Sequence, residues 1–484
     1  MKHYLGISAG FHDAAATVVD SSGNIVYAGH AERYSKIKND SNLHKDMFFE
    51  LARDCHIDHI AYYETPWKKQ LRQLYSGQGI EWSKLTTRQI LRKQLGGYFS
   101  DVPFTAYNHH LSHAAAGFQT SPFARATVVV IDAIGEWDTI SIFGAQYNKG
   151  RAEYRRLWTQ RYPQSLGLFY SAITERIGLR PMEDEYITMG MSAWGRPEYT
   201  DTMSILLKEN LHVGIDQMFL PLARDVDIAS SAQAVIEREI YSVMQRARDF
   251  GWSRNLVYQG GVALNCLANR NLGEYFEKVW IMPNPGDAGS SLGAAALAYG
   301  GPIKFDHAFL GTEISGDYPV GAIIDSLHRD KITGVASGRA EFGPRALGNR
   351  SLLADPRGPD IKDRVNAIKR RQQFRPFAPV ILEEYANEYF DIPGGFCDTR
   401  YMQVVGRCRH PDLFPAITHV DGTSRIQTVP QDGSGIRRLL EAWYAQTNCP
   451  MLLNTSLNIR GEPMVNDRLD ADRFERLYDI RVHS

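Results

Sequence analysis

Hydrophobic runs separated by polar turn residues open the chain. Residues 3–9 and 14–20 have the composition of buried strands, and a turn rich in serine, glycine and asparagine precedes a third run at 25–28. The same order returns from Thr127, where TVVVID is followed by a glycine turn at Gly135 and then by TISIFGAQY. Two strand meanders of one design, far apart in the sequence, predict an α/β fold with two duplicated lobes, each built on a mixed sheet.

Apolar residues at helical spacing predict helices between and after these strands. Residues 85–95 and the segment that follows His109 have this spacing. Ser230 or Ser231 is expected to cap a further helix that extends to Phe250.

A strand, a glycine turn and a helix follow one another at residues 255–270. NLVYQ is the predicted strand, Gly260-Gly261 the turn and VALNCLANR the helix. Such a unit is a common cradle for phosphate or ribose, because the start of the helix offers unpaired N–H groups. The pattern closes with residues 286–289, GDAG, and the predicted helix SLGAAALAYG.

The composition is that of an ordinary soluble protein. Of 484 residues, 43% are hydrophobic and 23% charged, and the net charge is -1. No apolar run approaches the roughly 20 residues that a membrane span needs, and no signal-peptide core precedes the first strand. The five cysteines are scattered without a C-x-x-C pair, which is typical of reduced thiols. We therefore expect a cytoplasmic protein that binds no membrane and has no extended surface for nucleic acid.

Basic charge is concentrated in the last third of the chain. Gly300-Gly301-Pro302 marks a domain boundary, and residues 337–377 beyond it are dense in arginine, glycine and proline. A basic stretch within a nearly neutral protein predicts a local anion site.

His109 and His113 have the spacing of two metal ligands on one helical face. Residues i and i+4 of a helix point the same way, so both imidazoles can bind one ion. Asp132, at the end of a hydrophobic strand, and Asp287, in a glycine-flanked turn, are candidates to complete the site. Two histidines and two aspartates suit iron(II), manganese(II) or zinc. The alternative is a pair of surface histidines and two turn-capping aspartates.

These patterns, in their order along the chain, resemble the NodU/CmcH-type O-carbamoyltransferase family. The resemblance covers nearly the whole sequence, and a dozen motifs in one order are far more specific than any single one. The motifs are LGISAGFHDAAATVV (5–19), AERYSKIKND (31–40), HHLSHAAAGF (109–118), VIDAIGEWDT (130–139), SLGLFYSAITERIG (165–178), DIASSAQAV (227–235), GGVALNCLANR (260–270), GDAGSSLGAA (286–295), GRAEFGPRALGNRSLLADPR (338–357), FRPFAPVI (374–381), THVDGTSR (418–425) and LLNTSLNIRGEPMV (452–465).

The resemblance implies two catalytic modules. Residues 1–305 are expected to form a carbamoyl-transfer domain with two lobes of the actin and sugar-kinase type, related to the tRNA threonylcarbamoyl transferases. Residues 306–484 are expected to form a YrdC-like carbamoyl-adenylate synthase. In the family, carbamoyl phosphate and ATP, with Mg²⁺, give carbamoyl-AMP in the second module. A hydroxyl of a small molecule, sugar or nucleoside then attacks this anhydride in the first module, and AMP leaves.

The resemblance also assigns roles to individual residues. A metal site of His109, His113, Asp132 and Asp287 is expected to bind the phosphate of carbamoyl-AMP, with iron(II) as the expected ion and manganese(II) or zinc as alternatives. The residues expected to bind substrate or nucleotide are Arg345, Lys369, Arg375, Gly260, Gly261 and Asn265. The residues expected to take part in catalysis are His12, Asp227, Lys38, Arg425 and Arg460. Of these, His12 is the natural general base, and a turn histidine or a surface Lys38 without a catalytic role is the alternative.

Two departures from the family pattern bear on the acceptor. Ile187 stands where the family has the lysine of an E-x-K-x-M-G run, and the chain stops soon after GEPMV. Ile187 removes a charge and with it any nucleotide or acceptor contact that the lysine makes. The short C-terminus predicts an acceptor that differs from the better-known ones. Two other functions fit the same scaffold: threonylcarbamoyl transfer to tRNA, and nucleotide binding without catalysis. A homodimer is compatible with all three.

Overall fold

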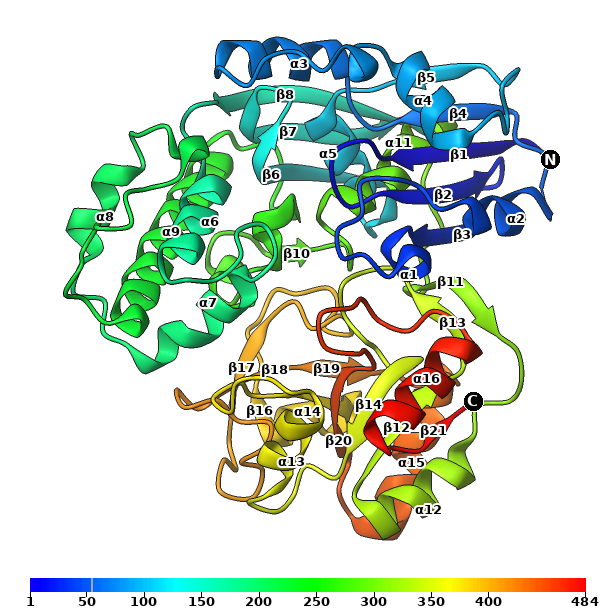
Figure 1. Ribbon diagram of the computed structural model, residues 1–484, viewed down its shortest axis with the longest axis vertical. Coiled ribbons are helices and arrows are strands. Elements are labelled where there is room, and N and C mark those ends of the chain that lie inside the picture. Colours follow the sequence, from blue (N-terminus) through cyan, green and yellow to red (C-terminus); the bar gives the residue numbers. More distant parts are fainter. Residues whose placement is uncertain (54) are drawn as a thin grey trace. The chain divides into compact units, whose positions relative to one another are not determined.

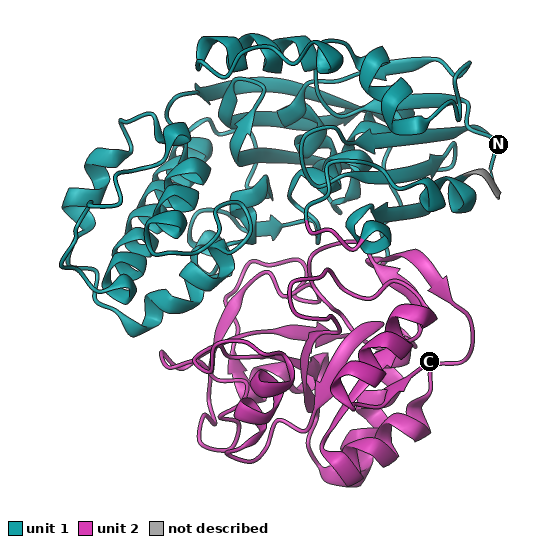
Figure 2. Ribbon diagram, in the orientation of Figure 1, with its two compact units in different colours: residues 1–35, 39–306 teal, residues 36–38, 307–484 magenta. Residues whose placement is uncertain are grey.

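The computed structural model describes residues 1–53 and 55–484. It divides into two compact units, the first formed by Met1–Ser35 and Asn39–Asp306 and the second by Lys36–Lys38 and His307–Ser484 (Figure 2). Within the described residues, the structure contains no helix with the length and apolar character of a membrane span.

The first sheet of the first unit has five strands in the order β3-β2-β1-β4-β5 (Figure 1). Its strands are β1 His3–Ser8, β2 Ala15–Asp20, β3 Ile25–His30, β4 His59–Tyr62 and β5 Phe104–Ala106. β1, β2 and β3 form an antiparallel meander, whereas β4 is parallel to β1 and β5 is parallel to β4. The predicted strands at the start of the chain are confirmed.

The second sheet repeats this topology. Its strands are β6 Arg125–Gly135, β7 Asp138–Asn148, β8 Arg151–Arg161, β9 Asn255–Gln259 and β10 Lys278–Trp280. Their order is β10-β9-β6-β7-β8, again with an antiparallel meander of three and two parallel strands on its other side. The predicted α/β class and the two duplicated lobes are therefore confirmed.

Two central helices join the lobes. α11 (Ser290–Tyr299) packs on β1 and β2, α5 (His109–Thr120) packs on β6 and β9, and the two helices pack on each other. Their contact depends on glycine, because a Cβ at Gly293 would lie 1.8 Å from the carbonyl oxygen of Ser112. A Cβ at Gly6 would likewise lie 1.9 Å from the carbonyl oxygen of Ser291, so α11 lies directly against β1.

The remaining helices of this unit correct two predictions. They are α1 Glu32–Ser35, α2 Lys45–Arg53, α3 Pro66–Tyr75, α4 Thr87–Leu95, α6 Leu166–Arg176, α7 Glu185–Met191, α8 Thr200–Leu206, α9 Asp225–Asp249 and α10 Cys266–Asn269. α9 begins before the predicted serine cap, and the Ser231 hydroxyl donates to the Asp227 carbonyl oxygen 2.7 Å away, inside the helix. The predicted helix at 262–270 is two short turns, because the side chain of Asn265 caps a new helix at Ala268 N.

The second unit is a separate α/β body with its own core. Its six-stranded sheet has the order β19-β15-β20-β14-β12-β21, β16, β17 and β18 form a second sheet, and β11 pairs with β13. The strands are β11 Phe309–Ile314, β12 Ile332–Ala336, β13 Gly338–Glu341, β14 Arg350–Ala354, β15 Ala378–Leu382, β16 Phe390–Asp391, β17 Val405–Cys408, β18 Thr423–Arg425, β19 Gln427–Val429, β20 Met451–Ser456 and β21 Val482–His483. The helices are α12 Val320–Asp330, α13 Ile361–Ile368, α14 Ala386–Tyr389, α15 Gly435–Thr447 and α16 Arg468–Tyr478. The YrdC-like assignment of this unit stays a prediction.

We predict that Gly293→Ala destabilises the first unit by about 1–3 kcal/mol, because the added methyl forces α11 and α5 apart. Gly190→Ala is the matched control: Gly190 also lies in a helix, and a Cβ there would meet no atom within 4 Å. Thermal unfolding followed by circular dichroism should show a lower Tm for the first variant and an equal or higher Tm for the second. Equal melting temperatures for Gly293→Ala and the wild type would contradict the proposed helix contact.

Candidate active site

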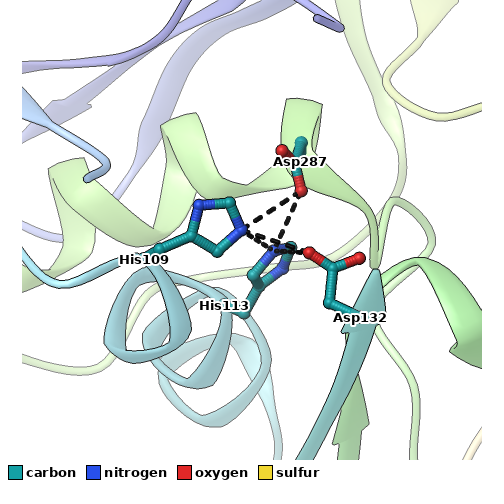
Figure 3. Close-up of side chains that lie close together, drawn as sticks. All are labelled: His109, His113, Asp132 and Asp287. Carbon is teal, nitrogen blue, oxygen red and sulfur yellow. Dashed lines mark hydrogen bonds and ion pairs between the residues drawn. The ribbon is translucent and has the colours of Figure 1, made fainter. Parts of the chain in front are cut away.

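Four buried side chains from distant parts of the sequence meet in the first unit (Figure 3). His109 and His113 lie one turn apart at the start of α5, and Asp132 lies near the end of β6. Asp287 begins the short 3-10 helix Asp287–Gly289 that leads into α11. One ligand atom from each residue lies within 4.8 Å of all the others. The i, i+4 pair and the strand-end carboxylate thus meet as the sequence pattern predicts.

Local polar contacts fix the start of α5. The Asn108 side chain accepts a hydrogen bond from Leu111 N, which is an N-cap. Glu136, buried in the turn between β6 and β7, accepts from the backbone N–H of His109 at 3.3 Å and from that of Thr65 at 2.7 Å. The first turn of the helix therefore begins at a defined residue, and this sets where both histidines point.

The facing atoms of the cluster are close. The Nε2 atom of His109 lies 3.2 Å from Asp132 Oδ2 and 3.4 Å from Asp287 Oδ1. The Nε2 atom of His113 lies 3.2 Å from Asp287 Oδ1, and the two Nε2 atoms are 3.1 Å apart. Two ring nitrogens and two carboxylates therefore face one small volume.

The outer ring nitrogens show which way each histidine is protonated. His113 Nδ1 lies 3.1 Å from the carbonyl oxygen of Pro285, which can only accept, so Nδ1 carries the hydrogen. His109 Nδ1 lies 3.2 Å from a carboxylate oxygen of Glu64, with the same consequence. In the neutral rings both Nε2 lone pairs then face each other and two anionic groups. This donor set requires a positive charge between its members, and a divalent cation fits it.

The electrostatics agree with this requirement. Burial alone would lower the pKa of His109, but Asp287, Asp132 and Glu64 raise it well above its usual value. Burial alone would raise the pKa of Asp287, but His109 and His12 hold it well below its usual value. Without a bound ion, a proton on His109 therefore supplies positive charge to the cluster. An ion bound by the four residues would replace that proton.

His12 lies at the accessible edge of the cluster. Its Nε2 is 3.4 Å from Asp287 Oδ2, its Nδ1 is 3.3 Å from Asp13 Oδ2, and its side chain is 39% exposed. Although burial would lower the pKa of His12, Asp287 and Asp13 raise it to about 9. Of the residues that the sequence predicted to be catalytic, His12 is brought into direct contact with the metal-like cluster.

The glycine turn after β9 supports the same cluster. Gly260 has φ +92, and a Cβ there would lie 2.1 Å from the carbonyl oxygen of Ile131. Gly261 N donates to Asp132 Oδ1 at 3.2 Å, so the turn fixes the carboxylate whose other oxygen faces the histidines. Glycine is needed at 260 both for its left-handed backbone and for this close approach.

Asn265 and Asp227 make structural contacts within the unit. The Asn265 amide exchanges two hydrogen bonds of 3.1 Å with the amide of Gln233. The Asp227 carboxylate accepts two hydrogen bonds from the Arg224 guanidinium, at 2.6 and 2.7 Å, and one from Arg196 N at 2.9 Å. The binding role of Asn265 and the catalytic role of Asp227 stay predictions.

A cationic cluster lies in the second unit. Lys369 is buried, and its ammonium donates to the carbonyl oxygen of Ser456 at 2.6 Å and to the side chain of Asn458. Burial lowers the pKa of Lys369 well below its usual value, and the charges of Arg371, Arg375 and Lys38 lower it further. The segment Lys36–Lys38 belongs to this unit, although the residues on either side of it belong to the first unit. Lys38 and Arg375 are therefore part of the electrostatic surroundings of Lys369.

The loop that carries Arg345 is held by one carboxylate. Glu341 Oε1 accepts hydrogen bonds from the backbone N–H groups of Leu347, Asn349 and Arg350, at 2.8, 3.0 and 3.2 Å. These three bonds fold the loop back on β13 and fix the backbone around Arg345.

Arg425 and Arg460 complete the set of predicted arginines in the second unit. Arg425 ends β18, and Arg460 is exposed after β20 with its backbone N–H 3.2 Å from the Tyr478 hydroxyl. Their part in catalysis stays a prediction.

Sequence reasoning missed the two buried glutamates around His109. Glu136 follows β6 directly, and Glu64 is separated from the end of β4 by one residue, after the hydrophobic run HIAYY. The rule that singled out Asp132, a carboxylate at the end of a hydrophobic strand, would also have selected Glu64.

Family models match both units. The model described as Carbamoyltransferase N-terminus matches residues 3–214 and 205–296, and the model described as Carbamoyltransferase C-terminus matches residues 324–482. The chain belongs to the carbamoyltransferase family. It is therefore an enzyme that transfers carbamoyl groups, as the motifs predicted.

Curated relatives extend over nearly the whole chain. An uncharacterised protein of Synechocystis sp. is 32% identical, over 98% of this chain and 94% of its own length. The nodulation protein NolNO of Sinorhizobium fredii is 31% identical, over 95% of this chain and 76% of its own length. Among solved structures, the activator of 2-hydroxyisocaproyl-CoA dehydratase from Clostridium difficile is 14% identical, with a TM-score of 0.35, over 61% of this chain and 94% of that chain.

We predict that binding of inorganic phosphate to the second unit takes up protons. A bound anion favours the charged form of Lys369, so the lowered pKa of this group rises on binding. At a pH between the pKa of the free protein and that of the complex, up to about one proton per phosphate is absorbed from the buffer. Isothermal titration calorimetry in two buffers of different ionisation enthalpy measures this uptake.

Two variants test the assignment to Lys369. Lys369→Met should abolish the uptake, whereas Arg364→Met should keep it, because Arg364 is a basic residue on the exposed face of the adjacent helix α13. Equal binding heats in both buffers for the wild-type protein would contradict the prediction.

Proposed function

We propose that this enzyme is an ATP-dependent O-carbamoyltransferase. In this proposal the second unit makes carbamoyl-AMP from carbamoyl phosphate and ATP, and the first unit transfers the carbamoyl group to a hydroxyl of a small molecule, sugar or nucleoside. The observation that carries it is the convergence of His109, His113, Asp132 and Asp287, with two nitrogen lone pairs and two carboxylates aimed at one point. This cluster lies in the part of the chain that matches the N-terminal carbamoyltransferase model.

The activation step requires a site that tolerates several negative charges. Carbamoyl phosphate loses its phosphate to one water, and the resulting carbamate oxygen attacks the α-phosphorus of ATP. The bond from that phosphorus to the β-phosphate oxygen breaks, so phosphate, pyrophosphate and carbamoyl-AMP are the products. Lys369 and Arg375, with Arg345 on its fixed loop, are the cations that we assign to these anions, and Mg²⁺ is expected with ATP.

The transfer step requires a base and a held leaving group. The acceptor oxygen attacks the carbamoyl carbon, the bond from that carbon to the AMP phosphate oxygen breaks, and AMP leaves. We assign the hydroxyl proton to Nε2 of His12, with Asp13 beside Nδ1 to hold the other ring proton in place. A cation bound by Asp287 would offset the carboxylate charge that raises the pKa of His12, and Nε2 could then accept a proton. A divalent ion in the four-residue site, iron(II) with manganese(II) or zinc as alternatives, would supply positive charge to the phosphate of carbamoyl-AMP.

We predict that purified protein releases pyrophosphate from ATP only when carbamoyl phosphate is present. Lys369→Met should lower this rate by about 100-fold or more, because a cation beside the transferring phosphorus is lost. Arg364→Met, which alters an exposed basic residue of α13, is the control and should keep the wild-type rate. Pyrophosphate release is followed by a coupled assay.

The transfer half-reaction is tested separately. Asp287→Asn should keep pyrophosphate release and lose carbamoylation of acceptors by about 100-fold or more, since the cluster loses a charged ligand. Mass spectrometry of a panel of sugars, nucleosides and host metabolites detects the added carbamoyl group, and Asp201→Asn, an exposed aspartate of α8, is the control. Absence of pyrophosphate release by the wild-type protein under every tested metal would overturn the proposed activity.

A further inference from the structure

A fully buried carboxylate lies behind the candidate metal site. Glu64 follows β4, its side chain has no exposed surface, and its Oε2 lies 3.2 Å from Nδ1 of His109. Glu64 is too far back in this arrangement to be one of the four converging ligands, because it contacts the ring nitrogen that points away from them. It therefore touches the site only through His109.

Lys69 completes this buried pair. Its ammonium lies 3.3 Å from Glu64 Oε2 and 3.4 Å from Glu64 Oε1, and 3.4 Å above the ring of Phe11. This is the geometry of an ion pair, so the carboxylate faces His109 as an ionised acceptor. Stability alone is a weak reason to bury such a pair, because the desolvation of both charges offsets their attraction.

The two histidines of the site differ in what supports them. Nδ1 of His113 donates to a neutral backbone carbonyl, whereas Nδ1 of His109 donates to the ionised Glu64. A carboxylate behind an imidazole fixes the proton on the outer nitrogen and makes the inner nitrogen a stronger electron-pair donor. The second nearby glutamate, Glu136, contacts His109 only through the backbone N–H.

We propose that Glu64, held by Lys69, is a positioning residue that fixes the tautomer and ring orientation of His109 so that its Nε2 lone pair faces the metal. The inference rests on the proposed function, because it requires that His109, His113, Asp132 and Asp287 bind an ion. The role of the buried pair Glu64 and Lys69 is then to strengthen metal binding through His109.

Titration with Co²⁺ alone, followed by visible absorption, tests this role without any turnover. The double variant Glu64→Leu/Lys69→Met removes both charges together and so leaves no unpaired charge in the core. It should bind Co²⁺ about 10–100-fold more weakly than the wild type, and its absorption bands should shift. Glu64→Gln/Lys69→Met also leaves no unpaired charge but keeps an acceptor oxygen for Nδ1, and it should restore most of the affinity.

Asp20→Asn is the control. It alters a buried carboxylate of the same unit that accepts hydrogen bonds from the backbone N–H groups of Ser22 and Asn24, so its Tm should fall while its Co²⁺ affinity stays within about twofold. Wild-type affinity and an unchanged spectrum in the folded double variant would overturn the role of Glu64 and leave the metal site intact. Failure of the wild-type protein itself to bind Co²⁺ would overturn the proposed metal site, and this inference with it.

Discussion

Buried negative charge at the start of α5 is the constraint on which the first unit depends. Asp132 and Asp287 face the two histidines, and Glu64 and Glu136 lie behind and beside His109. Anionic groups in a protein interior are tolerated only when positive charge or hydrogen bonds compensate them. Here the compensation comes from imidazole, from Lys69 and from backbone N–H groups. The carboxylates of Asp132 and Asp287 face the point where the four candidate ligands converge, and a cation there would compensate their charge.

Backbone packing brings this charge together. The ligands come from α5, from β6 and from the turn before α11, which belong to different lobes. Gly6 and Gly293 let α11 lie against β1 and α5 without intervening side chains, and Gly260 lets the turn after β9 approach β6. A bulkier residue at any of these contacts would move one ligand relative to the others. The glycines of the predicted motifs are therefore geometric requirements of the site.

Periodicity in the sequence was sufficient for the strands and for the pairing of His109 with His113. β1, β2, β6 and β9 lie where alternating and apolar runs predicted them, and the i, i+4 spacing of His109 and His113 needed only a helix to become a pair. The start of α9 was wrong because a serine that resembled a cap hydrogen-bonds back into the helix. A local pattern cannot distinguish these two uses of a hydroxyl.

α3 shows why Glu64 and Lys69 escaped sequence reasoning. This helix exposes about half of the side chains of Trp67 and Leu71, at 50% and 48%, while it buries Lys69 and Arg72 at 6% and 4%. A hydrophobic pattern places apolar residues inside and charges outside, so it assigns this helix the wrong face. The three-dimensional position of Glu64, which needs a buried cation, explains the burial of Lys69. At Lys69, the contact with a buried carboxylate decides which side of α3 is buried, and the hydrophobic pattern does not.

The two units carry opposite excesses of charge, and the overall charge of -1 conceals both. In the first unit two carboxylates and two lone pairs require a cation, whereas in the second unit Lys369 is buried with Arg371, Arg375 and Lys38 as its charged neighbours and requires an anion. The proposed reaction, which begins with two phosphorylated substrates and ends with a departing AMP, would use both kinds of site. Near-neutral composition therefore argued against an extended nucleic-acid surface, but it contained no information about these local fields.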